Sequence, residues 1–226
     1  MNIGIFGTGG VGRTLGAHLA HHHSVMLGTR DVAATLARTS PDAFGNPPIE
    51  TQGDGQSTIR IGTFAEAAAH GDVLINATAG HASLVAIGLA DRAHLNGKIL
   101  IDVSNPLDFS RGMPPSLFVS NTDSLAEQIQ RTFPELKVVK TLNSVTAAVM
   151  VNPAAVASGD HHMFVSGDHD GAREHVANYL TDWFGWEHVI DLGDLTAARA
   201  QEMLLPIWLS LWGVLGTPMF NLKVVR

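Results

Sequence analysis

The chain has 226 residues, 45% of them hydrophobic, and a formal net charge of −7, so it can bury one substantial core. The acidic balance and the lack of a basic stripe argue against nucleic acid or an anionic membrane as the main partner. Because cysteine is absent, disulfides and thiolate chemistry are excluded.

The N-terminal segment does not have the pattern of a signal peptide. Met1 leads directly into NIGIFG without a basic segment or a cleavage site, so we expect no signal peptide. The longest apolar stretch, residues 203–216, contains Pro206 and is short for a bilayer. We therefore expect a cytoplasmic protein in which this stretch forms a buried or interface helix.

Short apolar runs alternate with helical patterns along the first two thirds of the chain. Six runs predict buried strands, at residues 2–7, 24–29, 59–63, 72–78, 97–104 and 136–142. Helical character lies between most of them, for example at Gly10–Ala20 and Phe64–Ala69. This alternation predicts βαβ units with right-handed crossovers. We expect an α/β fold, with a Rossmann-type, doubly wound and mostly parallel sheet.

Two longer segments lack a regular pattern. Residues 40–58 are rich in Pro, Gly and polar residues, and a functional loop and a mobile surface excursion are equally good interpretations. Residues 104–120 contain SNPLDFSRGMPPS and follow a predicted strand. Ligands of open α/β sheets bind at the carboxyl ends of strands, so we expect this second segment to be functional.

The pattern weakens after Thr146. Residues 162–167 and 187–193 predict strands on either side of a helix near Gly171–Phe184. Residues 204–215 are apolar at three- and four-residue spacing around most of a helix, which indicates burial from more than one side. We expect a Rossmann domain at residues 1–146 and a small α+β subdomain at 147–226 that forms a ligand pocket, a dimer interface or both.

The segment GTGGVG, residues 7–12, lies between the first predicted strand and the first predicted helix. In the G-x-G-x-x-G pattern, Gly7 permits a tight turn and Gly9 lets the backbone approach a pyrophosphate. Gly12 allows close packing of helix and strand. The helix then presents free N–H groups and its positive dipole end to phosphates. The sequence therefore predicts a dinucleotide site.

The end of the second predicted strand indicates which dinucleotide binds. An acid at this point accepts hydrogen bonds from the ribose 2′-hydroxyl of NAD, but here Thr29 and Arg30 come first and Asp31 follows. A guanidinium binds a 2′-phosphate through charge-assisted bonds, and Thr29 can donate another. These residues favour NADP. The alternative is that Arg30 points to solvent and Asp31 contacts the ribose of NAD.

Further segments extend the pattern, in this order: DVSNPLDFSRG, VVKTLNSVTAA, VSGDHDGARE, DLGDLTAARAQEMLLPIWL and NLKVV. Together with GTGGVG and GTR, they make nearly the whole chain resemble the NADPH-dependent coenzyme F420 reductase family. The resemblance implies cofactor contacts from Thr8, Gly9, Gly10, Val11, Thr29 and Arg30. It also implies backbone or packing contacts around the nicotinamide from Thr78, Val103 and Ala147.

The resemblance implies hydride transfer between NADPH and a flavin-like or deazaflavin (F420) acceptor. Family members that reduce the deazaflavin often have a Pro-Trp pair where this chain has Ala79 and Gly80, so the acceptor stays open. Many also have further basic residues after the arginine, where Asp31 and Val32 stand here. The alternatives are a dehydrogenase of small hydroxy or imino acids and a non-catalytic NADP-binding sensor.

Hydride transfer to a flavin-like ring needs little from side chains, and no catalytic constellation is evident. Trp183 stands where a Tyr-x-x-x-Lys pair starting at Tyr179 would need lysine. A carbonyl substrate would need a proton donor, for which Lys140 and Asn143 are candidates. The competing interpretations are a surface lysine and an asparagine engaged in local turn bonding.

Twelve histidines raise the question of a metal site. His21–His23 form a run, and His161, His162 and His169 lie close together in sequence. Both groups fall in predicted loops, and neither has the spacing of a helical or carboxylate-supported ligand set. We therefore expect surface histidines and no metal.

Overall fold

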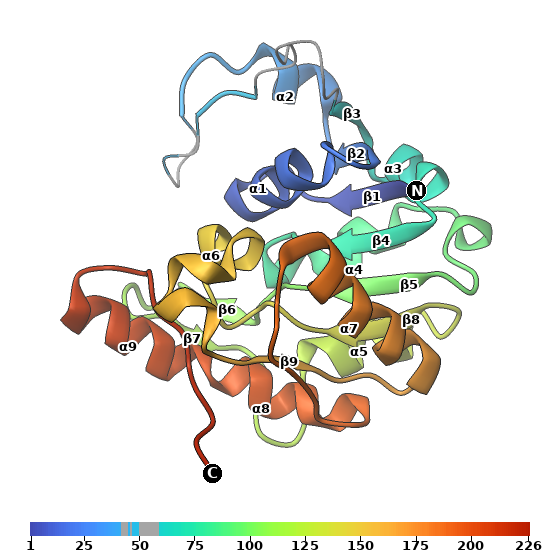
Figure 1. The fold of residues 1–226 in the computed structure, drawn as a ribbon. Coiled ribbons are helices and arrows are strands. Elements are labelled where there is room, and N and C mark those ends of the chain that lie inside the picture. Colours follow the sequence, from blue (N-terminus) through green and yellow to red (C-terminus); the bar gives the residue numbers. More distant parts are fainter. Residues whose placement is uncertain (42–44, 46, 50–58) are drawn as a thin grey trace.

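The computed structural model describes residues 1–41, 45, 47–49 and 59–226 (Figure 1). Its centre is a six-stranded sheet in the order β3-β2-β1-β4-β5-β8, and every neighbouring pair in it is parallel. The strands are β1 (Asn2–Phe6), β2 (Ser24–Thr29), β3 (Arg60–Thr63), β4 (Val73–Asn76), β5 (Ile99–Asp102) and β8 (Lys137–Lys140). All six predicted strands and the Rossmann-type fold class are confirmed.

Helices cover both faces of this sheet. Residues 1–132 contribute α1 (Gly10–Leu19), α2 (Val32–Ala37), α3 (Phe64–His70), α4 (Gly80–Gly88) and α5 (Leu125–Thr132), with a 3-10 turn at Arg92–His94. The capping box of α3 sets its start, because the Thr63 hydroxyl accepts from the Glu66 backbone and the Glu66 carboxylate accepts from the Thr63 backbone.

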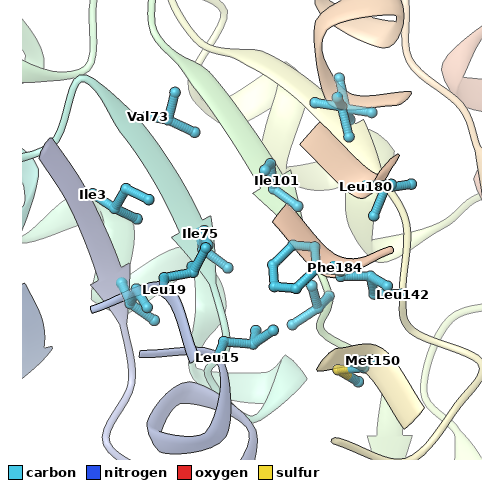
Figure 2. Packing of buried hydrophobic residues seen from close by; sticks show 14 of the residues in the cluster. Ile3, Leu15, Leu19, Val73, Ile75, Ile101, Leu142, Met150, Leu180 and Phe184 are labelled. Carbon is cyan, nitrogen blue, oxygen red and sulfur yellow. The ribbon is translucent and has the colours of Figure 1, made fainter. Parts of the chain in front are cut away.

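Two hydrophobic clusters lie on opposite faces of the sheet. In the first, Ile3 and Ile75 of the strands pack on the same side of the sheet as Leu15 of α1 (Figure 2). In the second, Phe6 and Leu74 pack with helices α3, α4 and α5. Adjacent strand residues thus point into different cores, which explains why the strands are continuous apolar runs without alternation.

The segment at residues 104–120 contains a short antiparallel hairpin made of β6 (Leu107–Asp108) and β7 (Ser116–Leu117). It follows the carboxyl end of β5, as predicted, but the expected lack of regular structure is wrong; a function for this segment stays a prediction. The segment at 40–58 lies largely outside the described residues, and the interpretations given for it stay open.

The last third of the chain contains α6 (Ala147–Val151), β9 (Met163–Val165), α7 (Asp170–Phe184), β10 (Val189–Asp191), α8 (Ala198–Met203) and α9 (Leu205–Leu215). Short 3-10 turns lie at Pro153–Ala155, Ala157–Gly159 and Leu195–Ala197. The two predicted strands are confirmed and pair in parallel. Residues of α6, α7 and β9 join the first hydrophobic cluster, and a domain boundary after residue 146 stays a prediction.

Helix α9 lies at the margin of the molecule (Figure 1). Leu205 is the one buried residue in it, and Ile207, Val214 and Leu215 are at least half exposed. The expected burial from more than one side is therefore wrong for the single chain. Periodicity shows that a helix is apolar around its circumference, but it does not show whether the same chain covers it. No helix among the described residues is long and apolar enough to cross a membrane.

Candidate functional site: a dinucleotide cradle and two cavities

The glycine loop joins β1 to α1 at the carboxyl edge of the sheet. Gly7 has φ +117°, and a Cβ there would lie 2.6 Å from the carbonyl oxygen of Ala77. A Cβ at Gly12 would collide with the carbonyl oxygen of Gly7, whereas one at Gly9 would meet nothing within 4 Å. The fold itself requires Gly7 and Gly12, but Gly9 borders open space, as expected of a position that a ligand approaches.

The first turn of α1 is free to receive an anion. Its N-cap residue Gly9 provides no side-chain cap, and no acidic residue lies in the turn. The first N–H groups of a helix lack intrahelical partners, and the helix dipole adds positive potential there. Residues 8–12 therefore fit the pyrophosphate of a dinucleotide.

At the end of β2, the side chains of Arg30 and Asp31 differ in their contacts. A carboxylate oxygen of Asp31 accepts from the Ala34 N–H at 2.9 Å and caps α2. Arg30 is exposed and has no hydrogen bond or ion pair within the part of the chain that the structure describes. Helix capping thus accounts for Asp31, while the guanidinium of Arg30 is available to a phosphate.

The hydroxyl group of Thr29 lies 2.9 Å from that of Thr35, which donates its own hydrogen to the Asp31 carbonyl oxygen at 2.7 Å. Thr29 is therefore the donor in the pair of hydroxyls. To donate to a 2′-phosphate, Thr29 would have to release Thr35.

Two cavities adjoin the glycine loop. One, of about 420 Å³, lies where α1, α6 and α9 approach the ends of β5 and β8, and Gly10 and Ala147 line it. The other, of about 250 Å³, is lined by Thr78 and by Gly80 at the start of α4. Val11, Val103 and Asn105 line both. The fold thus brings together Val11, Thr78, Val103 and Ala147, whereas Thr29 and Arg30 line neither cavity.

Gly80 leaves no room for a larger residue in this arrangement, whereas Ala79 is exposed. A Cβ at Gly80 would collide with the carbonyl oxygen of Asn105. A bulky side chain at this position would displace the loop that follows β5. The glycine at position 80 is therefore matched to the position of that loop.

Lys140 is fully buried, and the interpretation as a surface lysine is wrong. Its ammonium group donates to Asp102 Oδ2 at 2.9 Å and to the Ser104 carbonyl oxygen at 2.6 Å, and it lies 2.9 Å from Glu202 Oε1. These partners occupy all three N–H donors. Lys140 therefore has no free proton for a substrate, which argues against its candidacy as a proton donor.

The charges of this cluster compensate one another. Burial works against the ammonium form, but Asp102 and Glu202 raise the pKa of Lys140 above its ordinary value. Burial raises the pKa of Glu202, although Lys140 and the Leu125 N–H oppose that shift. Glu202 also accepts from the N–H groups of Leu125 and Ala126 at 2.9 and 3.1 Å, so it joins α8 to the start of α5.

Asp102 connects Lys140 to the neighbouring strand end. Its other oxygen, Oδ1, accepts from Asn76 Nδ2 at 2.9 Å and from the Ser104 hydroxyl at 2.7 Å. Asn76 in turn accepts from the Thr78 hydroxyl at 2.7 Å. A continuous polar network therefore lies beneath the loops that line both cavities and fixes their positions.

Asn143 is buried, and its amide is engaged by distant partners. Its Nδ2 donates to Asn105 Oδ1 at 2.9 Å and to the Gln201 carbonyl oxygen at 3.0 Å, and Asn105 Nδ2 donates back to the Asn143 carbonyl oxygen. Local turn bonding is therefore wrong, and both amide hydrogens are occupied within the protein. Sequence reasoning missed Asp102, Gln201 and Glu202, for which the one local signal was a charged residue ending the apolar strand β5.

His161 is buried, so the expected surface position is wrong for this histidine, and both His161 and His162 have structural contacts. His161 Nε2 lies 3.0 Å from the Pro153 carbonyl oxygen, and Asn221 Nδ2 lies 2.8 Å from His161 Nδ1. The Val224 N–H donates to His162 Nδ1 at 3.2 Å. Both residues thus hold the C-terminal tail. Among the described residues, no group of three or more histidines and carboxylates could hold a metal ion.

A parallel doubly wound sheet, an uncapped helix N-terminus behind a glycine loop and a free arginine after β2 together define a Rossmann-type dinucleotide-binding protein. Residues 2–106 match the model of the family described as NADP oxidoreductase, coenzyme F420-dependent. A solved structure from Arthrobacter sp. FB24, provisionally named an F420-dependent NADP reductase, is 51% identical over the whole of both chains, with a TM-score of 0.93. The chain belongs to this family and is an NADP-dependent oxidoreductase.

More distant relatives cover most of the chain. The F420-dependent NADP reductase of Methanocaldococcus jannaschii is 28% identical over 93% of this chain and 92% of its own length. The metalloreductase STEAP3 of Rattus norvegicus is also 28% identical, over 91% of this chain, but the match spans only 37% of that protein.

Proposed function

We propose that the protein transfers hydride between NADPH and a planar flavin-like or deazaflavin (F420) acceptor. The observation that carries the proposal is the pair of cavities that share Val11, Val103 and Asn105 beside the glycine loop. His81 is the one titratable side chain among the residues that line them. Such an arrangement suits a reaction in which the protein supplies distance, orientation and exclusion of water.

The cofactor would lie along the carboxyl edge of the sheet. We assign its contacts to Gly7, Thr8, Gly9, Gly10, Val11, Gly12, Thr29, Arg30, Thr78, Val103 and Ala147. The uncapped turn of α1 would bind the pyrophosphate, and Arg30 the 2′-phosphate. When bound, the nicotinamide supplies the hydride, and the loops held by the Lys140 network keep the cavity walls in place.

The hairpin after β5 provides apolar surface for the acceptor. Phe109 lines the smaller cavity, and Phe109, Phe118 and His81 line an adjoining hollow of about 480 Å³. Phe109 and Phe118 are half exposed. Exposed aromatic rings beside a cofactor site favour a planar apolar acceptor.

A dehydrogenase of small hydroxy or imino acids is less well supported. It needs a proton donor at the reacting atom, but Lys140 and Asn143 have all their side-chain hydrogens engaged. His81 would then be the donor that remains.

The test is NADPH consumption by the purified protein, screened against coenzyme F420, FMN, FAD, quinones, small ketones and imines. We expect turnover with the deazaflavin or flavins, none with ketones or imines, and none in the Gly9→Val variant. Turnover confined to carbonyl compounds or imines would refute the proposal. Tight NADPH binding with no turnover of any acceptor would instead indicate a sensor.

We further infer that the protein works in the cytoplasm as a homodimer in which α9 meets its copy. Ile207, Val214 and Leu215 form an exposed apolar face on this helix, while Leu205 and Trp208 line the larger cavity. A monomer seldom leaves such a face uncovered. Pairing through α9 would bury the face and stabilise one wall of the cavity.

A further inference from the structure

The larger cavity is lined by two side chains that each have an unpaired polar atom. Asn143 Oδ1 and Trp208 Nε1 are both buried and have no hydrogen-bond partner among the residues that the structure describes, and both residues line the same cavity of about 420 Å³. Buried polar atoms in native proteins are nearly always paired, and an unpaired one costs free energy. One of these atoms is an acceptor and the other is a donor.

The orientation of the Asn143 amide is fixed by its neighbours. The Gln201 carbonyl oxygen can only accept, so the atom 3.0 Å from it must be the amide nitrogen. The same nitrogen donates to Asn105 Oδ1 at 2.9 Å. The unpaired atom is therefore the oxygen, and turning the amide over would place this one oxygen against two acceptors.

The indole of Trp208 is also held in place. Its ring centroid lies 5.4 Å from those of Trp212 and Phe220, with an interplanar angle of 29° to Phe220. An indole N–H can only donate. Contacts on the ring therefore fix the position of this donor, which belongs to a residue of the cavity wall.

We propose that this cavity binds a planar amide, with Asn143 Oδ1 accepting from its N–H and Trp208 Nε1 donating to its carbonyl oxygen. The inference rests on the proposed function, because two molecules of that reaction carry this chemistry: the carboxamide of the nicotinamide and the imide edge of a flavin-like acceptor. Gly10, Val11 and Ala147 line the same cavity, so a group there lies next to the phosphate cradle.

Direct binding to the full chain tests the proposal without turnover, by titration calorimetry with matched ligands. In the first arm, NADP⁺ is compared with its 3-acetylpyridine analogue, which keeps the carbonyl and lacks the amide N–H. In the second, riboflavin is compared with 3-methylriboflavin in the presence of saturating NADP⁺. A lost neutral hydrogen bond should weaken binding by about fivefold in the arm whose ligand occupies the cavity.

Two variants test whether Trp208 and Asn143 are the side chains that bond the amide. Trp208→Phe should weaken the binding of the parent ligand and the binding of its analogue equally, by about fivefold, because both molecules keep the carbonyl group. Asn143→Ser should remove the discrimination between the two ligands. Trp183→Phe is the matched control, since Trp183 packs on Tyr179 of α7 and does not line the cavity; binding should not change.

Discrimination in the NADP⁺ arm assigns the site to the nicotinamide, and discrimination in the flavin arm assigns it to the acceptor. Equal binding of both members in both arms overturns the inference, as does a Trp208→Phe variant that binds like Trp183→Phe. If Asn143→Ser does not fold, the ligand comparison on the unmodified chain and Trp208→Phe still decide. Failure of the acceptor screen would refute the proposed function and leave discrimination in the NADP⁺ arm intact.

Discussion

The ammonium group of Lys140 lies 2.9 Å from a carboxylate oxygen of Asp102, and both side chains are completely inaccessible to solvent. The two residues are also direct partners in the register of β5 and β8. Glu202 of α8 contacts the same ammonium group. One cation thus joins two strand ends and a helix from the last third of the chain, directly beneath the loops of the candidate site.

Removing this cation should strongly destabilise the protein. Lys140→Met keeps much of the side-chain volume but leaves Asp102 and Glu202 buried without a counter-charge, which costs about 3–5 kcal/mol. Urea unfolding followed by circular dichroism measures the loss. Lys137→Met, on the same strand but only partly buried, should change stability by less than about 0.5 kcal/mol. Similar unfolding midpoints for the two variants would contradict the role given to Lys140.

The sequence predicted those elements in which burial or backbone geometry determines the residue types. The central strands are buried on both faces and therefore appear as apolar runs, and Gly7 and Gly12 are required by the backbone geometry at the turn. The Lys140 network left little trace, because its members are far apart in sequence. The exposure of α9 was not predictable either, since apolar spacing does not reveal what covers a helix. The two-residue strands β6 and β7 are too short to give a pattern.

Arg30→Ala should weaken NADPH binding by about tenfold or more and leave NADH binding nearly unchanged. The reason is that the lost charge-assisted bonds, each about 1.5–3 kcal/mol, are made only to the 2′-phosphate. Titration calorimetry with both cofactors measures the difference. Equal losses for NADPH and NADH would show that Arg30 does not contact the phosphate. A selective loss of NADH binding in Asp31→Asn would favour the ribose contact over the capping role.

Gly9→Val should abolish cofactor binding in a protein that still folds. The added side chain meets no protein atom near its Cβ, so the fold tolerates it, but it occupies the space through which the pyrophosphate approaches. Thermal unfolding checks the fold and calorimetry checks NADPH binding. Gly171→Val is the control, because a Cβ there also meets nothing within 4 Å and the residue lies in α7. A folded Gly9→Val variant with normal affinity would show that the loop is not the phosphate cradle.

Acid should weaken the pairing of Asp123 with Arg131. Hydrogen bonds from Arg131 lower the pKa of Asp123 to about 2, so between about pH 4 and pH 2 the unfolded chain binds more protons than the folded one. The stabilisation is complete above that range and is lost as the pH falls through it. Because Arg131 is 60% exposed, the contribution is at most about 1 kcal/mol. Asp123→Asn should therefore lower the melting temperature near pH 7 and have much less effect near pH 2. If the two proteins differed in melting temperature by the same amount at pH 7 and pH 2, the contribution given to the Asp123–Arg131 pair would be contradicted.

The apolar face of α9 should hold the dimer together. Val214 is 85% exposed in the single chain, and a carboxylate there would have to be buried without a partner if two copies paired through this helix. We expect the unmodified protein to sediment as a dimer at micromolar concentration and Val214→Asp to sediment as a monomer. Val225→Asp is the matched control, because Val225 is 83% exposed but lies in the C-terminal tail, and it should remain dimeric.

NADPH oxidation should fall with dissociation, because the opposite edge of α9 lines the larger cavity through Leu205 and Trp208. A monomeric unmodified protein with full activity would refute the dimer and its link to the site.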